Sequence, residues 1–137
     1  MKFSQLLLVA ITLVVLTACS KSSSSSSNTS VAGYLINGDW FVHIYSEGGT
    51  DQTSNYTGYK FTFSGTGTFV VVKDDISTNG TWADDAANSK LIINMTTLDA
   101  NLQKLVRNWV VTGKAYDLIE MTDDNTTHDK IFHLKRL

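Results

Sequence analysis

The sequence contains no proline and only one cysteine, Cys19, among its 137 residues. A single cysteine cannot form an internal disulfide, and an odd cysteine in a secreted protein needs an explanation. Because proline is missing, the breaks between regular segments fall on glycine, asparagine, aspartate, serine and threonine, which favour turns for other reasons.

The sequence also lacks the motifs that mark common active sites. It has no Gly-x-Ser-x-Gly elbow around a nucleophile and no glycine-rich loop that opens a helix. Nothing in it places two carboxylates at the separation that glycoside hydrolysis requires. We therefore expect a protein that is not an enzyme and that carries no cofactor.

What is present at the start of the chain has the pattern of a secretory signal. Lys2 supplies one positive charge, and an apolar run over residues 6–16 follows it. The run is too short and too close to a cleavage point to span a membrane. It ends in Leu16-Thr17-Ala18-Cys19, which resembles the lipobox of bacterial lipoproteins. The resemblance implies that residues 1–18 are removed and that the thiol of Cys19 carries lipid.

Lipidation at Cys19 would hold the protein in the cell envelope. Each buried CH₂ of an acyl chain contributes about 0.8 kcal/mol, so two or three chains anchor a protein stably. Ser20, rather than aspartate, follows the cysteine, which by resemblance to enterobacterial sorting implies the outer membrane. Whether the protein faces the periplasm or the cell surface stays open.

The rest of the chain divides into a tether and a domain. Residues 19–35 are rich in serine, which buries no apolar surface, and predict a flexible tether. Residues 36–137 have the length of a single domain. Without residues 1–18 the chain has ten basic and thirteen acidic residues, a net charge of −3. This charge argues against nucleic acid or an anionic lipid surface as a partner.

Short runs of β-branched and aromatic residues predict an all-β domain. About eight runs recur at the spacing that is typical of a β-sandwich or a barrel: residues 40–45, 59–63, 68–73, 81–83, 90–95, 107–112, 116–121 and 128–135. Asp74 and Asp75 begin a turn that we expect to end near Asn79-Gly80. One short helical turn is predicted near residues 98–105, with Asp99 as its cap.

The order of these motifs resembles the lipocalin-like lipoproteins of Bacteroidetes-type bacteria. The resemblance rests on Gly38-Asp39-Trp40, on residues 59–69, on Gly80-Thr81-Trp82, and on Trp109-Val110-Val111 with Leu118. It implies a small antiparallel up-and-down β-barrel and no particular activity. The chain departs from lipocalins proper, which have a long C-terminal helix and often a disulfide.

Two metal hypotheses remain as alternatives. A barrel brings its first and last strands together, so His43 and His133 could form a pair rather than separate surface histidines. Residues 123–129 offer many oxygen atoms but lack the glycine and the terminal glutamate of an EF-hand loop. We interpret this segment as a turn, with calcium binding as the alternative, and predict no metal site.

The aromatic residues support two hypotheses about function. They could line a cavity for a small apolar or amphipathic ligand, or they could fill the barrel and leave its surface to bind another envelope protein. The residues named for ligand binding are Trp40, Tyr45, Tyr56 and Trp109, with the polar loop 46–57 at one mouth of the barrel. An empty interior would favour the first hypothesis, and a packed interior would favour the second.

Overall fold

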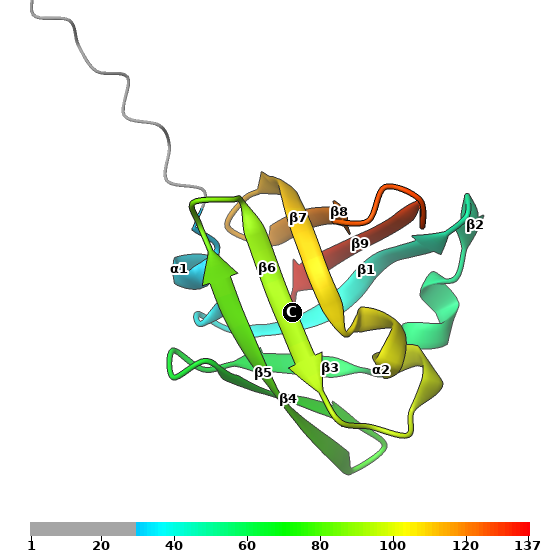
Figure 1. The fold of residues 1–137 in the computed structure, drawn as a ribbon. Coiled ribbons are helices and arrows are strands. Elements are labelled where there is room, and N and C mark those ends of the chain that lie inside the picture. The colour runs from blue at the N-terminus through cyan, green and yellow to red at the C-terminus, as the bar shows by residue number, and fades with distance from the viewer. Residues whose placement is uncertain (1–29) are drawn as a thin grey trace, which may run out of the picture.

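The computed structural model describes residues 30–137, which fold into antiparallel strands with three short helical segments (Figure 1). In chain order the elements are α1 (Ala32–Leu35), β1 (Asp39–Glu47), β2 (Thr50–Asp51), the 3-10 helix η1 (Thr53–Tyr56), β3 (Lys60–Phe63), β4 (Thr68–Lys73), β5 (Ile76–Asp85), β6 (Lys90–Met95), α2 (Ala100–Leu105), β7 (Arg107–Lys114), β8 (Leu118–Asp123) and β9 (Lys130–Arg136).

Strands β1 and β3 to β9 form a closed antiparallel barrel. Each strand pairs with the next one along the chain, and β9 returns to pair with β1 from Trp40↔Arg136 to Glu47↔Lys130. The short strand β2 pairs with β1 outside this ring. The predicted all-β barrel of about eight strands is confirmed, and α2 lies within the predicted helical turn.

The inward faces of the strands follow the alternation of the sequence, with one interruption in β1. On β3 and just before it, Tyr59, Phe61 and Phe63 are all buried, as their spacing predicts. In β1 the register with β9 shifts between Val42 and Ile44. This bulge adds one residue to the strand, so Tyr45 points inward and Ile44 outward.

The predicted turn at Asn79-Gly80 is wrong, because both residues lie inside the long strand β5. The tight turn is made earlier, by Asp74 and Asp75, which adopt φ angles of 49° and 63°. Aspartate tolerates this left-handed region better than most residues. Gly80 is instead paired with Phe69 of β4, whose ring covers the position that a Cβ would occupy.

Large apolar side chains fill the barrel and form one continuous core. Aromatic rings pack against one another in the interior. The ring centroids are 5.4 Å apart for Phe63 and Phe69 and 5.0 Å apart for Trp109 and Phe132. The largest fully buried side chains are Trp40, Trp109, Tyr45, Phe61, Phe69, Phe132, Leu35, Leu91, Ile93, Leu102, Leu105 and Ile119. Their volume agrees with an eight-stranded barrel, whose interior is just wide enough for side chains to fill.

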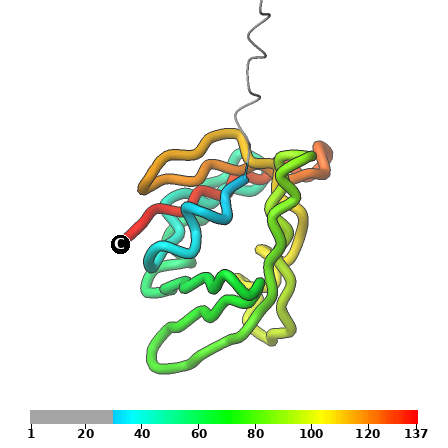
Figure 2. The backbone as a smooth tube through the Cα atoms, turned by 90° about the vertical axis from the view of Figure 1, so that its left-hand side faces the viewer, coloured from blue at the N-terminus to red at the C-terminus, as the bar shows by residue number. Residues whose placement is uncertain are grey.

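A short helix covers each end of the barrel. At the end that Figure 2 faces, Val31 and Leu35 are fully buried, so packing begins before Ile36, where the sequence places the start of the domain. Helix α2 covers the other end through Leu102 and Leu105. No helix within residues 30–137 is long and apolar enough to cross a membrane.

Candidate functional site

The α2 end of the barrel collects most of the residues that could act on a partner. Helix α2 begins there because the carboxylate of Asp99 accepts hydrogen bonds from the backbone N–H groups of Asn101 and Leu102, at 2.9 and 3.1 Å. The hydroxyl of Tyr59 donates to the same side chain at 2.5 Å. Burial raises the pKa of Asp99, but these hydrogen bonds outweigh it and hold the pKa below its usual value.

Three of the four residues that the sequence names for ligand binding lie together beneath α2. The rings of Tyr45 and Tyr56 are 4.9 Å apart, and both residues are buried. Tyr56 donates its hydroxyl to the carbonyl of Asn101 at 2.9 Å, and the indole of Trp109 donates to the carbonyl of Leu105 at 3.0 Å. These contacts give Tyr56 and Trp109 a structural role in holding α2.

Trp40 lies at the opposite end, where its indole donates to the carbonyl of Leu35 at 2.9 Å. The structure therefore does not bring Trp40 together with Tyr45, Tyr56 and Trp109 in one site. Tyr56 also lines a surface groove of about 440 Å³ beside β1, with Phe41 and Tyr59 among its walls. Whether any of these residues touches a ligand stays a prediction, and Cys19 lies outside the described residues.

Tyr45 has an unusual environment. Its hydroxyl is buried and has no hydrogen-bond partner in residues 30–137. Burial, followed by the negative charge of Glu47, raises the pKa of Tyr45 to about 12. The side chain is therefore neutral at physiological pH. Its buried hydroxyl lowers the stability of the folded state, because it has given up its hydrogen bonds to water without gaining one from the described residues.

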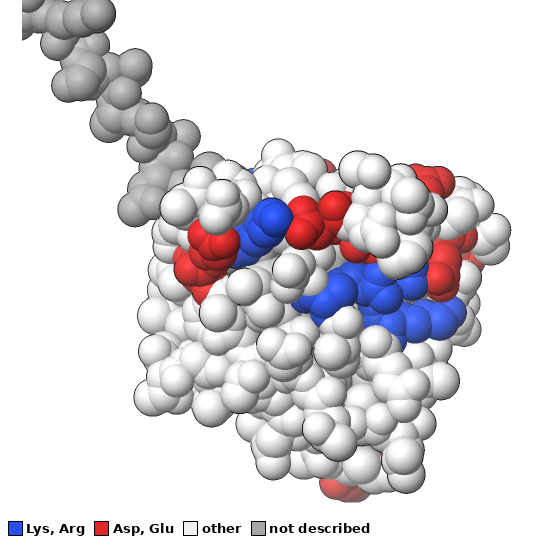
Figure 3. Space-filling view, viewed as in Figure 1, with Lys and Arg blue, Asp and Glu red and all other residues white. Residues whose placement is uncertain are grey.

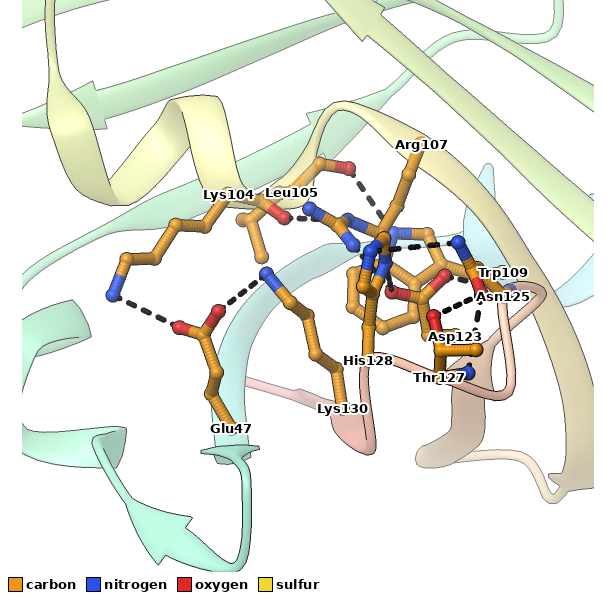
Figure 4. A network of polar contacts seen from close by, with 10 residues as sticks. All are labelled: Glu47, Lys104, Leu105, Arg107, Trp109, Asp123, Asn125, Thr127, His128 and Lys130. Carbon is orange, nitrogen blue, oxygen red and sulfur yellow. Dashed lines mark hydrogen bonds and ion pairs between the residues drawn. The ribbon is translucent and has the colours of Figure 1, made fainter.

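A buried carboxylate, Asp123, organises the charged part of this end (Figure 4). Its side chain is 5% exposed and forms an ion pair with Arg107. Nε of Arg107 also donates a hydrogen bond to the carbonyl of Lys104. The N–H of Asn125 donates to Asp123 at 2.9 Å, and Nδ1 of His128 lies 3.2 Å away. Burial raises the pKa of Asp123, but the hydrogen bonds from Asn125 and Arg107 lower it more, so the carboxylate is ionised.

Beside this cluster, Glu47 at the end of β1 bridges two lysines. Its carboxylate lies 2.7 Å from Nζ of Lys130 and 3.1 Å from Nζ of Lys104. Both hydrogen bonds lower the pKa of Glu47, and the one from Lys130 has the larger effect. Lys104 belongs to α2 and Lys130 to β9, so the bridge connects the covering helix to the barrel wall. Figure 3 shows basic and acidic side chains side by side on this face.

Two surface concavities flank α2. A wide, open groove of about 630 Å³ is lined by polar residues, including Arg107, Asn108, Asn125 and His128. A smaller pocket of about 240 Å³ lies at the mouth of the barrel, and its walls are Tyr59, Val71, Lys73, Asp74, Ile76, Thr78, Asp99 and Leu102. The groove offers hydrogen-bonding groups that are already partly engaged, whereas the mouth pocket has an apolar floor.

Exposed apolar side chains stand next to the mouth pocket. Ile76 is 71% exposed, and Leu98, which precedes the pocket residue Asp99, is 99% exposed. Exposed side chains of this size at the rim of a pocket are candidates for contact with a partner. The stretch 46–57, expected to be a long polar loop, instead contains β2 and η1.

The charged residues of this site were not among those named from the sequence. Glu47, Arg107, Asp123 and Lys130 all lie at strand ends, because antiparallel strands bring alternate turns to the same end of a barrel. The position of these charged residues at predicted strand ends is the sequence signal that could have identified them. The sequence places Asp123 in a turn, with calcium binding as the alternative, and the hydrogen bond that Asp123 accepts from the N–H of Asn125 forms such a turn.

Closure of the barrel places His43 and His133 on the paired strands β1 and β9. In the described part of the chain, no group of three or more histidine, cysteine, aspartate or glutamate side chains is placed to hold a metal ion. His133 faces Glu120 across β8 and β9, at 4.0 Å. The pKa of His133 lies below its usual value. Burial is the largest cause; the nearby Glu120 opposes it, and His43 adds to it.

Comparison with known proteins relates this barrel to one solved structure. It is similar to a DUF4847 family protein from Bacteroides vulgatus, with a TM-score of 0.61 and 14% sequence identity, over 77% of this chain and 96% of that chain. At this identity the likeness concerns the fold alone. No protein-family model matches the chain, and no curated protein matches it.

Proposed function

We propose that this chain is a noncatalytic envelope protein, anchored to the outer membrane through lipid on Cys19, which binds another envelope protein with the α2 end of its barrel. The observation that supports this proposal is the packed interior. Trp40, Tyr45, Phe61, Phe69 and Trp109 are each at most 1% exposed and lie in one core. Since the interior is filled, contacts with a partner would use the outer surface.

The geometry favours the α2 end as that surface. The described chain begins beside α1, whereas α2 covers the opposite end of the barrel (Figure 1). A tether joined to the α1 end would leave the α2 end free to meet a neighbour. Ile76 and Leu98 would provide apolar contacts there, and the surrounding ion pairs would form a polar rim.

A photo-crosslinking amino acid at position 98 of the full chain, expressed in cells, tests this proposal. We expect one discrete protein adduct, which should be lost when Ile76→Asp is added to the same chain. Ala83, an exposed residue on the outer wall of β5, is the matched control position and should give no such adduct. Adducts that are absent, or that are equal at positions 98 and 83, would refute the proposal.

A small apolar ligand is the second candidate, and the mouth pocket is the observation that favours it. The pocket volume of about 240 Å³ lies below the range of roughly 300–1,000 Å³ that drug-sized ligands occupy, so only a chain end or a small group would enter. A fluorescent fatty acid tests this candidate. Uptake that is abolished by Thr78→Trp, which would fill the pocket, supports a ligand; no uptake by the unaltered chain counts against it.

A further inference from the structure

The end of the barrel opposite to α2 has its own exposed surface, which the proposed function does not use. Of six large apolar side chains exposed in residues 30–137, three lie at this end. We call it the tether-end surface and define it by Tyr34, Ile36, Tyr116, Arg136 and Leu137. Figure 2 faces it, with α1 in front and the C-terminus beside it.

The chain is fixed to the barrel at this end. Asp84 accepts hydrogen bonds from the hydroxyl of Ser30 and from the N–H groups of Val31 and Ala32, at 2.6, 2.8 and 3.0 Å. Lys114 donates to the carbonyl of Ser30 at 3.3 Å. Val31 is fully buried. Four hydrogen bonds and one buried side chain therefore fix the point at which the tether joins the domain.

The length of the tether limits how far this end can be from the anchor. Eleven residue steps separate Cys19 from Ser30, and an extended chain spans at most about 3.6 Å per residue, or roughly 40 Å in all. A lipid on Cys19 would therefore keep the tether-end surface close to the bilayer. Tethering raises the effective concentration of the two surfaces, so even modest contacts would be populated.

The side chains at this end are of the kind found at the boundary of a bilayer. Tyr116 is 73% exposed at the tip of the β7–β8 turn, and Ile36 is 42% exposed. The guanidinium of Arg136 lies 4.1 Å from the ring centroid of Tyr116 and 5.0 Å from that of Trp40. Tyrosine places its ring among headgroups, and arginine keeps its charge in water while its stem lies along apolar surface.

Arg136 also ties this surface to α1. Its two terminal nitrogens donate to the carbonyls of Asn37 and Tyr34, at 2.5 and 3.0 Å. Arg136, whose guanidinium lies over the ring of Tyr116, is thus held by α1 and by Asn37 just beyond its end. Tyr116 and Ile36 are both exposed at the end of the barrel where the tether joins the domain.

We propose that the tether-end surface rests on the headgroup region of the bilayer and so orients the barrel with α2 outward. The inference rests on the proposed lipid anchor. Contact is made by Tyr116, Ile36 and Leu137 rather than by attraction to anionic lipid. The guanidinium of Arg136 already donates to two backbone carbonyls, Asp117 lies beside Tyr116, and the chain is acidic overall. The occupant is therefore a zwitterionic lipid surface.

The test uses the chain from Cys19 onward, coupled through the Cys19 thiol to a maleimide phospholipid in phosphatidylcholine vesicles. Chemical coupling makes the result independent of whether cells lipidate Cys19. A fluorescent noncanonical amino acid is placed at position 116 or, as a control at the far end, at position 98. Lipids with a nitroxide near the headgroup should quench the probe at 116 several-fold more than the probe at 98.

A second comparison tests the contact residues themselves. With the probe at position 117, Tyr116→Asp should reduce quenching to the level seen at position 98, whereas Ile76→Asp at the other end should leave it unchanged. Both variants should keep the melting temperature of the parent. Equal quenching at 116 and 98, or crosslinks from 116 to a second protein copy in place of quenching, would overturn the proposal. Failure of lipid labelling at Cys19 in cells would instead contradict the anchor.

Discussion

Replacing Gly80 with alanine tests how completely the barrel is filled. Gly80 lies in β5 opposite Phe69, and a Cβ at this position would overlap the ring carbons Cε1 and Cζ of Phe69. It would also lie 2.7 Å from the backbone carbonyl oxygen of Asn94. Phe69 is 1% exposed and stacks on Phe63, so its ring has little freedom to withdraw.

The expected loss follows from these contacts. An added methyl in a packed core costs about 1–3 kcal/mol when neighbours must shift, and both the ring of Phe69 and the backbone at Asn94 would have to move. For a domain of this size, 1 kcal/mol lowers the melting temperature by roughly 4–8 °C. Alanine gains roughly 0.5–1 kcal/mol over glycine in a strand. Because three atoms lie closer than 3.0 Å to the added Cβ, we take the upper part of the cost range, about 2–3 kcal/mol, which leaves a net loss of at least about 1 kcal/mol. Gly80→Ala should therefore lower the melting temperature by at least about 4 °C.

Urea unfolding, followed by tryptophan fluorescence, measures this loss, and Gly113→Ala is the matched control. Gly113 is also in a strand, but its Cβ would meet the carboxylate of Glu120, the end of a flexible and exposed side chain. We expect Gly113→Ala to change the free energy of unfolding by less than about 0.5 kcal/mol. The double variant Phe69→Leu, Gly80→Ala should lose less free energy of unfolding than the two single variants together, because the smaller leucine leaves room for the added methyl. If Gly80→Ala and Gly113→Ala are equally mild, the interior is not packed as described.

Three further predictions concern the cap, the buried carboxylate and the anchor. Asp99→Ala should lower the free energy of unfolding by about 1–2 kcal/mol in urea, because α2 loses its N-cap, and Asp99→Asn should lose less; equal losses would contradict capping. The pKa of Asp123 in the folded protein is below its ordinary value of 3.8. The ionised carboxylate therefore stabilises the folded state at neutral pH, and this stabilisation is lost as the pH falls below about 4. The stability gap between the parent and Asp123→Asn should accordingly narrow at acidic pH, and a constant gap would refute this. Cys19→Ala should abolish lipid labelling and release the protein from membranes; a variant that stays bound would contradict the anchor.

The sequence predicts the barrel well because its strands carry strong local signals. The alternation of Tyr59, Phe61 and Phe63 needs only the two-residue period of a strand, and the cap at Asp99 needs only a local hydrogen bond. The error at Asn79-Gly80 has a non-local cause. A glycine beside an asparagine favours a turn locally, but here Phe69 of the neighbouring strand occupies the space that the missing side chain leaves.

The candidate site is harder to predict for a similar reason. Arg107 and Asp123 are sixteen residues apart and meet because β7 pairs with β8. Glu47 and Lys130 are separated by most of the chain, and only closure of the barrel between β1 and β9 brings them together. The bulge in β1 is also invisible in the sequence. It turns Tyr45 into the core, where its ring packs against that of Tyr56 instead of facing a polar loop.

The two ends of the barrel are covered by the same arrangement, and this bears directly on function. Each covering helix is too short to be stable alone. At each end an aspartate, Asp84 or Asp99, accepts N–H groups at the start of the helix, and a tryptophan indole donates to the carbonyl of its last residue, Leu35 or Leu105. Opening either end to admit a ligand would break these hydrogen bonds and expose buried leucines. Covered ends are therefore part of the folded state, which supports the proposal that a partner would be bound on the outer surface.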